Sequence, residues 1–182
     1  MELTGERTLP ADRATAWAAL NDVELLKLSI PGCESLSALG GNRYEAVVNA
    51  AIGPVKARFK GALELADIDA PNGYTLRFDG SGGQAGFARG EARVRLSDGG
   101  PGQTHLAYTA QAHIGGKLAQ IGSRLVDAAS GAMADKFFEA FSAQLAARAA
   151  PAGAAGSRAP SAKVGFWSLL LAMLRRLFKR NG

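Results

Sequence analysis

The sequence predicts an α+β domain in which a curved antiparallel sheet wraps around one long helix near the end of the chain. Between residues 44 and 114, apolar residues recur at every second position, which is the period of a half-buried strand. Turn sequences rich in Gly, Pro, Asn and Asp separate most of these runs. Beyond residue 116 apolar residues recur every three or four positions, which is typical of an amphipathic helix.

The first part of the chain predicts one strand and two short helices. Residues 2–9 alternate weakly and fit a strand, and the Pro-Ala-Asp sequence that follows opens a helix running through Asn21. A second helix, over residues 23–28, is stopped by Pro31. Strands are then expected near 44–52, 55–65, 74–79, 92–96 and 105–114. Each has one apolar and one polar side, so the sheet must pack on another layer.

That layer is the helix expected over about 116–148. The apolar side of the sheet is rich in alanine and glycine, and the space left by small residues is either closed by the neighbouring layer or kept as a cavity. We expect a cavity, because a strongly curved sheet cannot close everywhere on a straight helix. Its guest would be apolar and flat or elongated. The candidate ligand-binding residues are Tyr44, Phe59, Phe78, Tyr108, Ile121, Gly122, Leu125, Met133 and Phe137.

Core packing without a ligand is the alternative for each of these residues. Gly122 is a special case, since a glycine inside a helix costs up to about 1 kcal/mol relative to alanine. It either makes room at the mouth of the cavity or serves close packing.

Charge is divided unevenly along the chain, which has 21 Lys and Arg, 16 Asp and Glu, and a net charge of +5. The first 150 residues carry a net charge of −1 and residues 151–182 carry +6. A balanced domain argues against nucleic-acid binding, which needs a basic face on the fold itself. A polybasic run beside an apolar segment instead fits an anionic membrane surface.

Three parts are therefore expected: a ligand-binding domain over 1–148, a flexible linker over 149–163 and an amphipathic membrane anchor over 164–182. A helix over 164–178 would be about 22 Å long, short of the roughly 30 Å core of a bilayer, so it would lie along the surface. The alternative is a last helix packed on the domain's own core. The residues expected to bind the membrane are Phe166, Trp167, Leu169, Leu170, Leu171, Leu174, Arg175, Arg176, Leu177, Phe178, Lys179 and Arg180.

No catalytic or metal site is expected. Cys33, the single cysteine, follows a turn and has no base near it in the sequence, so a structural role is favoured. His105 and His113 share the polar side of one strand and do not form a metal set. The glycine-rich stretch 80–86 precedes a strand rather than a helix, which predicts a hairpin tip and not a phosphate loop.

The expected location is the cytoplasmic side of the inner (cell) membrane, as a peripheral protein. One cysteine excludes an intrachain disulfide and suits a reducing compartment. The polar and acidic N-terminal sequence predicts no signal peptide.

Five strings resemble the family of the carbon monoxide dehydrogenase G protein (CoxG), which is part of the START-like (SRPBCC) superfamily. They are PADRATAW at 10–17, LND at 20–22, IPGCESL at 30–36, IGPVKA at 52–57 and GGKLAQIGSRL at 115–125. The resemblance implies a helix-grip (START/Bet v 1-like) fold and a non-enzymatic accessory protein with no covalently bound cofactor. It also implies a quinone guest, menaquinone or ubiquinone, presented ring outward at the cavity rim. The implied partner is a molybdenum hydroxylase of the carbon monoxide dehydrogenase type, recruited to the membrane for electron transfer.

Two other readings stay open at this point. One is a cyclase- or hydrolase-like enzyme of the same superfamily acting on an aromatic or polyketide substrate. The other is a docking adaptor whose interior is filled by its own side chains.

Overall fold

The computed structural model describes residues 1–149, which form one seven-stranded antiparallel sheet and four α-helices. The strands are β1 (Glu2–Leu9), β2 (Cys33–Gly40), β3 (Arg43–Ile52), β4 (Val55–Asp69), β5 (Gly73–Ser81), β6 (Phe87–Asp98) and β7 (Thr104–Gly115). The helices are α1 (Arg13–Leu20), α2 (Val23–Ser29), α3 (Lys117–Gln120) and α4 (Ser123–Ala149), and a short 3-10 turn, η1 (Gly83–Ala85), lies at the tip of the β5–β6 hairpin. The expected linker beyond Ala149 and the expected membrane anchor over 164–182 lie outside the described residues.

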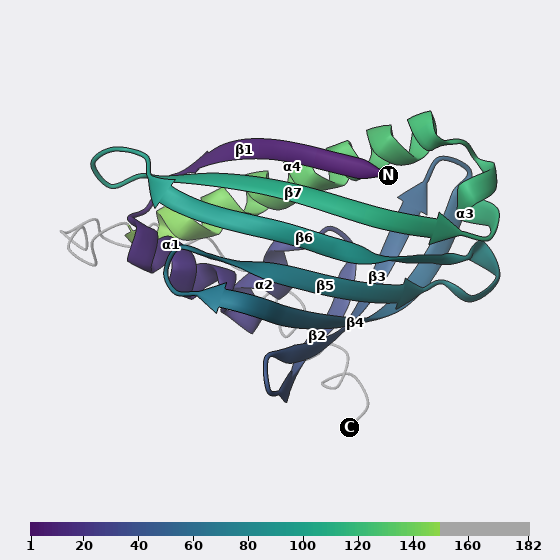
Figure 1. Ribbon diagram of the computed structural model, residues 1–182, viewed down its shortest axis with the longest axis horizontal. Helices are drawn as coiled ribbons and strands as arrows, with labels where there is room; N and C mark the ends of the chain where they lie inside the picture. The colour runs from purple at the N-terminus through teal and green to yellow at the C-terminus, as the bar shows by residue number, and fades with distance from the viewer. Residues whose placement is uncertain (150–182) are drawn as a thin grey trace, which may run out of the picture. The chain divides into compact units, whose positions relative to one another are not determined.

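The predicted arrangement of a curved sheet around a long helix is confirmed (Figure 1). The strand order is β1-β7-β6-β5-β4-β3-β2, so β2 to β7 form a meander and β1 pairs with β7 at one edge. Figure 1 shows α1 and α2 at one end of the strands and α3 at the other. The inner face of the sheet and α4 thus enclose a space with helices at both ends.

Two elements differ from the prediction. Residues Cys33–Gly40 form an edge strand whose pairing with β3 is interrupted by register shifts, so the sequence lacks a regular alternation there. The helix predicted to begin at residue 116 is divided into α3 and α4 at Gly122. This glycine has a φ of +90°, a left-handed conformation that ends one helix and re-aims the next.

The buried core lies where α1, α2 and the later turns of α4 pack on the sheet. Phe141 and Leu145 of α4 belong to one cluster with Leu9, Leu25 and Leu106, and all five are at most 1% exposed. Away from this cluster the space between α4 and the sheet is not filled by side chains, and this is where the candidate site lies.

Asp22 holds α2 against α4. Its carboxylate accepts a hydrogen bond from the N–H of Leu25 at 3.1 Å and pairs with Arg148 at 2.8 Å. These two partners hold the pKa of Asp22 below its ordinary value. The cap and the ion pair together fix the helix that closes one end of the site.

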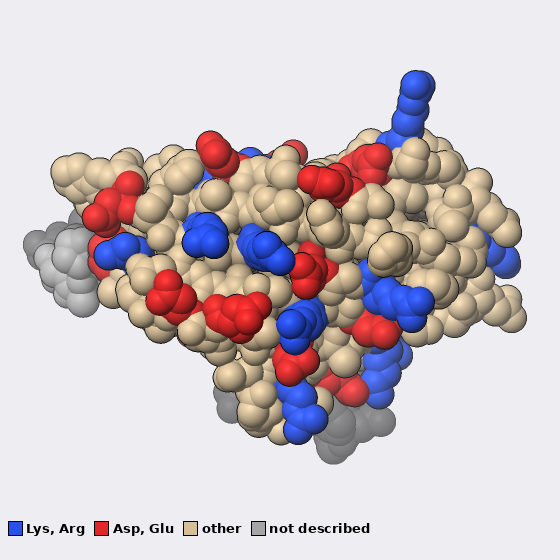
Figure 2. Space-filling model, in the orientation of Figure 1, with Lys and Arg blue, Asp and Glu red and all other residues tan. Residues whose placement is uncertain are grey.

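The outer face of the sheet is charged and balanced. Arg43, Glu64, Arg77 and Glu91 pair in register across β3 to β6, so the sign of the charge alternates from strand to strand. Figure 2 shows positive and negative side chains interspersed on this face. Such a face lacks the single-sign basic surface that nucleic acid requires.

Within residues 1–149, none of the helices has the length and apolar character needed to cross a membrane.

Candidate ligand-binding site

Two apolar cavities lie between the inner face of the sheet and the helices. The wide cavity has a volume of about 390 Å³ and is bounded by β3 to β7, α3 and α4. The tyrosine cavity has a volume of about 280 Å³ and is bounded by the sheet, α1, α2 and α4. Ile30 and Leu63 line both, so the cavities adjoin. Sites for small molecules are typically about 300–1,000 Å³ in volume.

A row of small residues explains the wide cavity. Ala46, Gly61, Gly80 and Ala88 face one another across β3, β4, β5 and β6, and all four line the cavity. Because none carries more than a methyl group, the inner surface of the sheet is lowered across four strands. A Cβ atom at Gly80 would lie 3.7 Å from the carbonyl oxygen of Ala88, so the space beside this glycine is open.

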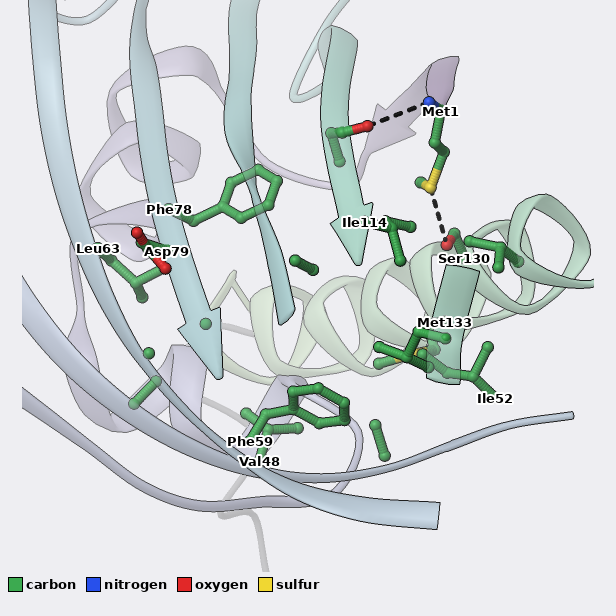
Figure 3. A pocket seen from close by; sticks show the side chains of 18 of the residues that line it. Met1, Val48, Ile52, Phe59, Leu63, Phe78, Asp79, Ile114, Ser130 and Met133 are labelled. Carbon is green, nitrogen blue, oxygen red and sulfur yellow. Dashed lines mark hydrogen bonds between the residues drawn. The ribbon is translucent and has the colours of Figure 1, made fainter. Parts of the chain in front are cut away.

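Larger apolar side chains surround this row. Figure 3 shows Phe59 and Phe78 extending from the sheet and Met133 from α4 into the space between them. Met1 is 38% exposed and marks where the cavity reaches the surface. Its sulfur lies 3.5 Å from the Oγ of Ser130, the hydroxyl that α4 contributes to this lining.

Aromatic rings wall the tyrosine cavity. Tyr108 stacks on Phe138 with ring centroids 5.4 Å apart, and Tyr74 meets Trp17 of α1 edge to face at 5.8 Å. Burial, and then the nearby Tyr44, raise the pKa of Tyr74 well above its ordinary value. Its hydroxyl is therefore neutral at physiological pH and able to donate a hydrogen bond.

The family model for the carbon monoxide dehydrogenase G protein (CoxG) matches residues 5–146. The chain belongs to the CoxG family. This confirms the family expected from the five sequence strings, and the match spans nearly all of the described part of the CoxG-family chain.

Solved structures confirm the START-like helix-grip fold of this CoxG-family domain. A conserved protein from Geobacillus kaustophilus is 31% identical, covers 81% of this chain and 96% of its own, and has a TM-score of 0.77. A START superfamily protein from Mycobacterium smegmatis is 12% identical, with coverages of 81% and 98% and a TM-score of 0.64. The Zhui aromatase/cyclase from Streptomyces sp. R1128 is 12% identical, with coverages of 84% and 98% and a TM-score of 0.63. At such low identity the last two show the fold alone. No curated protein matches the chain.

The structure divides the sequence-predicted ligand-binding residues into three groups. Phe59, Phe78 and Met133 line the wide cavity, whereas Tyr44, Tyr108 and Phe137 line the tyrosine cavity. The third group, Ile121, Gly122 and Leu125, lines neither cavity.

The third group sits at the junction of α3 and α4. Leu125 is 51% exposed, and its side chain and that of Ile121 lie within 4 Å of where a Cβ of Gly53 would be, beside the β3–β4 turn. Gly122 has open space around it, and its left-handed φ of +90° accounts for a glycine there. The two explanations considered from sequence, room at the cavity mouth and close packing, both assumed an unbroken helix.

Sequence reasoning missed two prominent lining residues, Tyr74 and Phe138. Tyr74 shares a strand face with Phe78, so the alternation of β5 could have identified it. Phe138 follows Phe137 directly and lies off the three- and four-residue series of α4, and only its stacking on Tyr108 reveals its place.

The groups considered for other chemistry lie away from both cavities. Cys33 is half-buried, and burial raises the pKa of its thiol, which disfavours the reactive thiolate. His105 lies 3.9 Å from Glu6 on the outer face of the sheet, and His113 is exposed. The described residues contain no group of three or more His, Cys, Asp or Glu placed to hold a metal ion.

Proposed function

We propose that this CoxG-family protein is a membrane-anchored accessory protein that carries a quinone-like lipid and recruits a molybdenum hydroxylase of the carbon monoxide dehydrogenase type. The observation that carries the proposal is the pair of adjoining cavities, about 390 and 280 Å³ in volume, with nearly all their lining apolar. A compact ring with an aliphatic tail would occupy both.

The energetics of such a cavity suit a carrier. A CH₂ group moved from water into the cavity gains about 0.8 kcal/mol. A tail that comes from a bilayer gains much less, because lipid chains are already as apolar as leucine side chains. Exchange between membrane and cavity is then close to balanced, so the protein can both take up and release its guest.

Membrane attachment is proposed for residues 164–182, on their sequence. Arg175, Arg176, Lys179 and Arg180 follow an apolar run that contains Trp167. Each basic residue near an anionic surface contributes roughly 1 kcal/mol, and the apolar side chains add to this. The proposed location is therefore the cytoplasmic face of the cell membrane.

The recruitment of a molybdenum hydroxylase rests on membership of the CoxG family. Electrons released by such an enzyme need an acceptor, and a quinone held beside the bilayer would supply one.

The ligand proposal is tested by purifying the full chain from membranes in mild detergent and identifying released lipids by mass spectrometry. We expect quinone near one molecule per chain, and less in a Gly80→Val variant in which the wide cavity is partly filled. An interior without lipid would contradict the proposal and favour a docking adaptor. Turnover of an added aromatic substrate would favour an enzyme.

The membrane and partner proposals need a separate experiment. Deletion of residues 164–182 should abolish sedimentation with anionic liposomes and leave the circular dichroism spectrum of the domain unchanged. The hydroxylase should sediment with membranes only when the full chain is present. Continued sedimentation of the truncated chain would show that another surface binds the membrane.

A further inference from the structure

The tyrosine cavity contains three hydroxyl groups in an otherwise apolar lining, those of Tyr44, Tyr74 and Tyr108. In the described part of the chain, every fully buried side-chain nitrogen or oxygen has a hydrogen-bond partner. None of the side-chain hydrogen bonds found within residues 1–149 uses a tyrosine hydroxyl. These hydroxyls therefore border open volume.

Tyr108 differs from the other two tyrosines. Its hydroxyl end lies against β1, where a Cβ atom at Gly5 would be 2.5 Å from the hydroxyl oxygen and 2.6 Å from the adjoining ring carbon. Its oxygen thus covers the main chain of β1. The hydroxyls of Tyr44 and Tyr74 remain as the polar groups that a guest of this cavity could meet.

The lining also defines the charge of that guest. Among the residues that the structure describes, no Lys, Arg, Asp or Glu lines the tyrosine cavity. An ionised head group buried there would lose its hydration without gaining a counter-charge, which is strongly unfavourable. A neutral carbonyl or hydroxyl oxygen needs only a hydrogen-bond donor, which a protonated tyrosine provides.

We infer that the guest lies with a neutral, oxygen-bearing ring in the tyrosine cavity, hydrogen-bonded to Tyr44 and Tyr74, and with its aliphatic tail in the wide cavity toward Met1. This inference rests on the proposed function and adds the orientation of the guest. It reverses the orientation expected from sequence, in which the ring sits at the rim. The wide cavity suits a tail because its lining is almost entirely apolar.

Trp17 provides a reporter, because its ring centroid lies 5.8 Å from that of Tyr74. The chain contains two tryptophans, so a full-length Trp167→Phe protein fluoresces from Trp17 alone. The probe is a 1,4-naphthoquinone with a short isoprenoid tail, whose ring quenches indole fluorescence on close approach. We expect saturable quenching of Trp17, measured in detergent at constant ionic strength.

The tyrosine variants then test the hydrogen bonds. Tyr44→Phe and Tyr74→Phe should each raise the Kd by about threefold to tenfold, the equivalent of one hydrogen bond. Tyr108→Phe is the matched control from the same cavity and should leave the Kd unchanged. The probe's tail attached to naphthalene, which lacks the ring oxygens, should bind more weakly to the unmodified chain and equally well to the Tyr74→Phe variant. This ligand-side change keeps the test decisive if one tyrosine variant fails to fold.

The outcomes separate the two proposals. Quinone binding by equilibrium dialysis with neither quenching of Trp17 nor any effect of Tyr44→Phe and Tyr74→Phe would place the ring elsewhere and overturn the inference, while the carrier function would stand. Failure of the unmodified chain to bind the quinone would overturn both.

Discussion

Replacing Gly80 with valine should stabilise the domain and weaken its ligand binding at the same time. Gly80 lies in the row of small residues beneath the wide cavity. A Cβ atom there would be 3.7 Å from the carbonyl oxygen of Ala88 and 4.0 Å from the Cα of Gly61, both ordinary van der Waals distances. The backbone can therefore stay in place, and the two methyl groups of valine project into the cavity.

The size of the effect follows from the atoms added. Three carbon atoms transferred from water to an apolar cavity contribute at most about 2.4 kcal/mol, at about 0.8 kcal/mol each. Removal of glycine's freedom in the unfolded chain adds about 0.4–1 kcal/mol. Because the cavity is only partly filled, we expect the free energy of unfolding to rise by about 1–3 kcal/mol, with roughly 2–4 °C in Tm for each kcal/mol.

Urea unfolding monitored by circular dichroism measures this change. Ala51→Val is the matched control, since Ala51 is exposed on the outer side of β3 and the added methyl groups meet no cavity. Its effect should stay within about 0.5 kcal/mol. If Gly80→Val instead lost 1 kcal/mol or more (roughly fivefold in the unfolding equilibrium) at an unchanged m-value, the site would already be packed in solution and the reasoning from the cavity would be refuted.

Three further predictions test the frame around the site. Gly131 lies inside α4 with no atom within 4 Å of the position that a Cβ would take, so Gly131→Ala should raise the free energy of unfolding by about 1 kcal/mol, whereas Gly122→Ala, at φ +90°, should lower it by about 1–2 kcal/mol; calorimetry on both variants checks the opposite signs. The depressed pKa of Asp22 contributes stability above its unfolded value of 3.8 that is lost as the pH falls through the lower folded value, so urea unfolding at about pH 6 and about pH 3 should differ less in Asp22→Ala than in the unmodified chain. Burial raises the pKa of the Cys33 thiol, so alkylation by iodoacetamide near neutral pH should be several-fold slower than in the urea-unfolded chain, and equal rates would contradict this.

The direction of strand side chains could be predicted because it is a local property. Alternation with a period of two places Phe59 and Phe78 on the inner face and Lys60 on the outer face, and the structure agrees. The frequency of alanine and glycine on the inner face also predicts a cavity. Its position could not be predicted, since Ala46 and Gly80 come to lie in one row only through the register of three successive hairpins.

The errors at the end of the sheet have one physical cause. A helical series that continues through residue 122 places Ile121 and Leu125 on the same face as Met133. The left-handed backbone at Gly122 turns the chain between them, so Met133 lines the wide cavity while Leu125 is 51% exposed. A glycine in a helical pattern predicts either a tolerated cost or a break, and sequence periodicity alone does not separate the two.

The tyrosine cavity also bears on the choice between a carrier and an enzyme. General acid–base catalysis works best when the pKa of the catalytic group is near the working pH. The pKa of Tyr74 is raised, chiefly by burial, so this residue is a poor proton donor or acceptor for a reaction, although it remains a good hydrogen-bond donor. A cavity that binds an oxygen atom without exchanging its proton favours reversible binding over turnover. An aromatic substrate converted by the unmodified chain, with the rate lost in Tyr74→Phe, would reverse this argument.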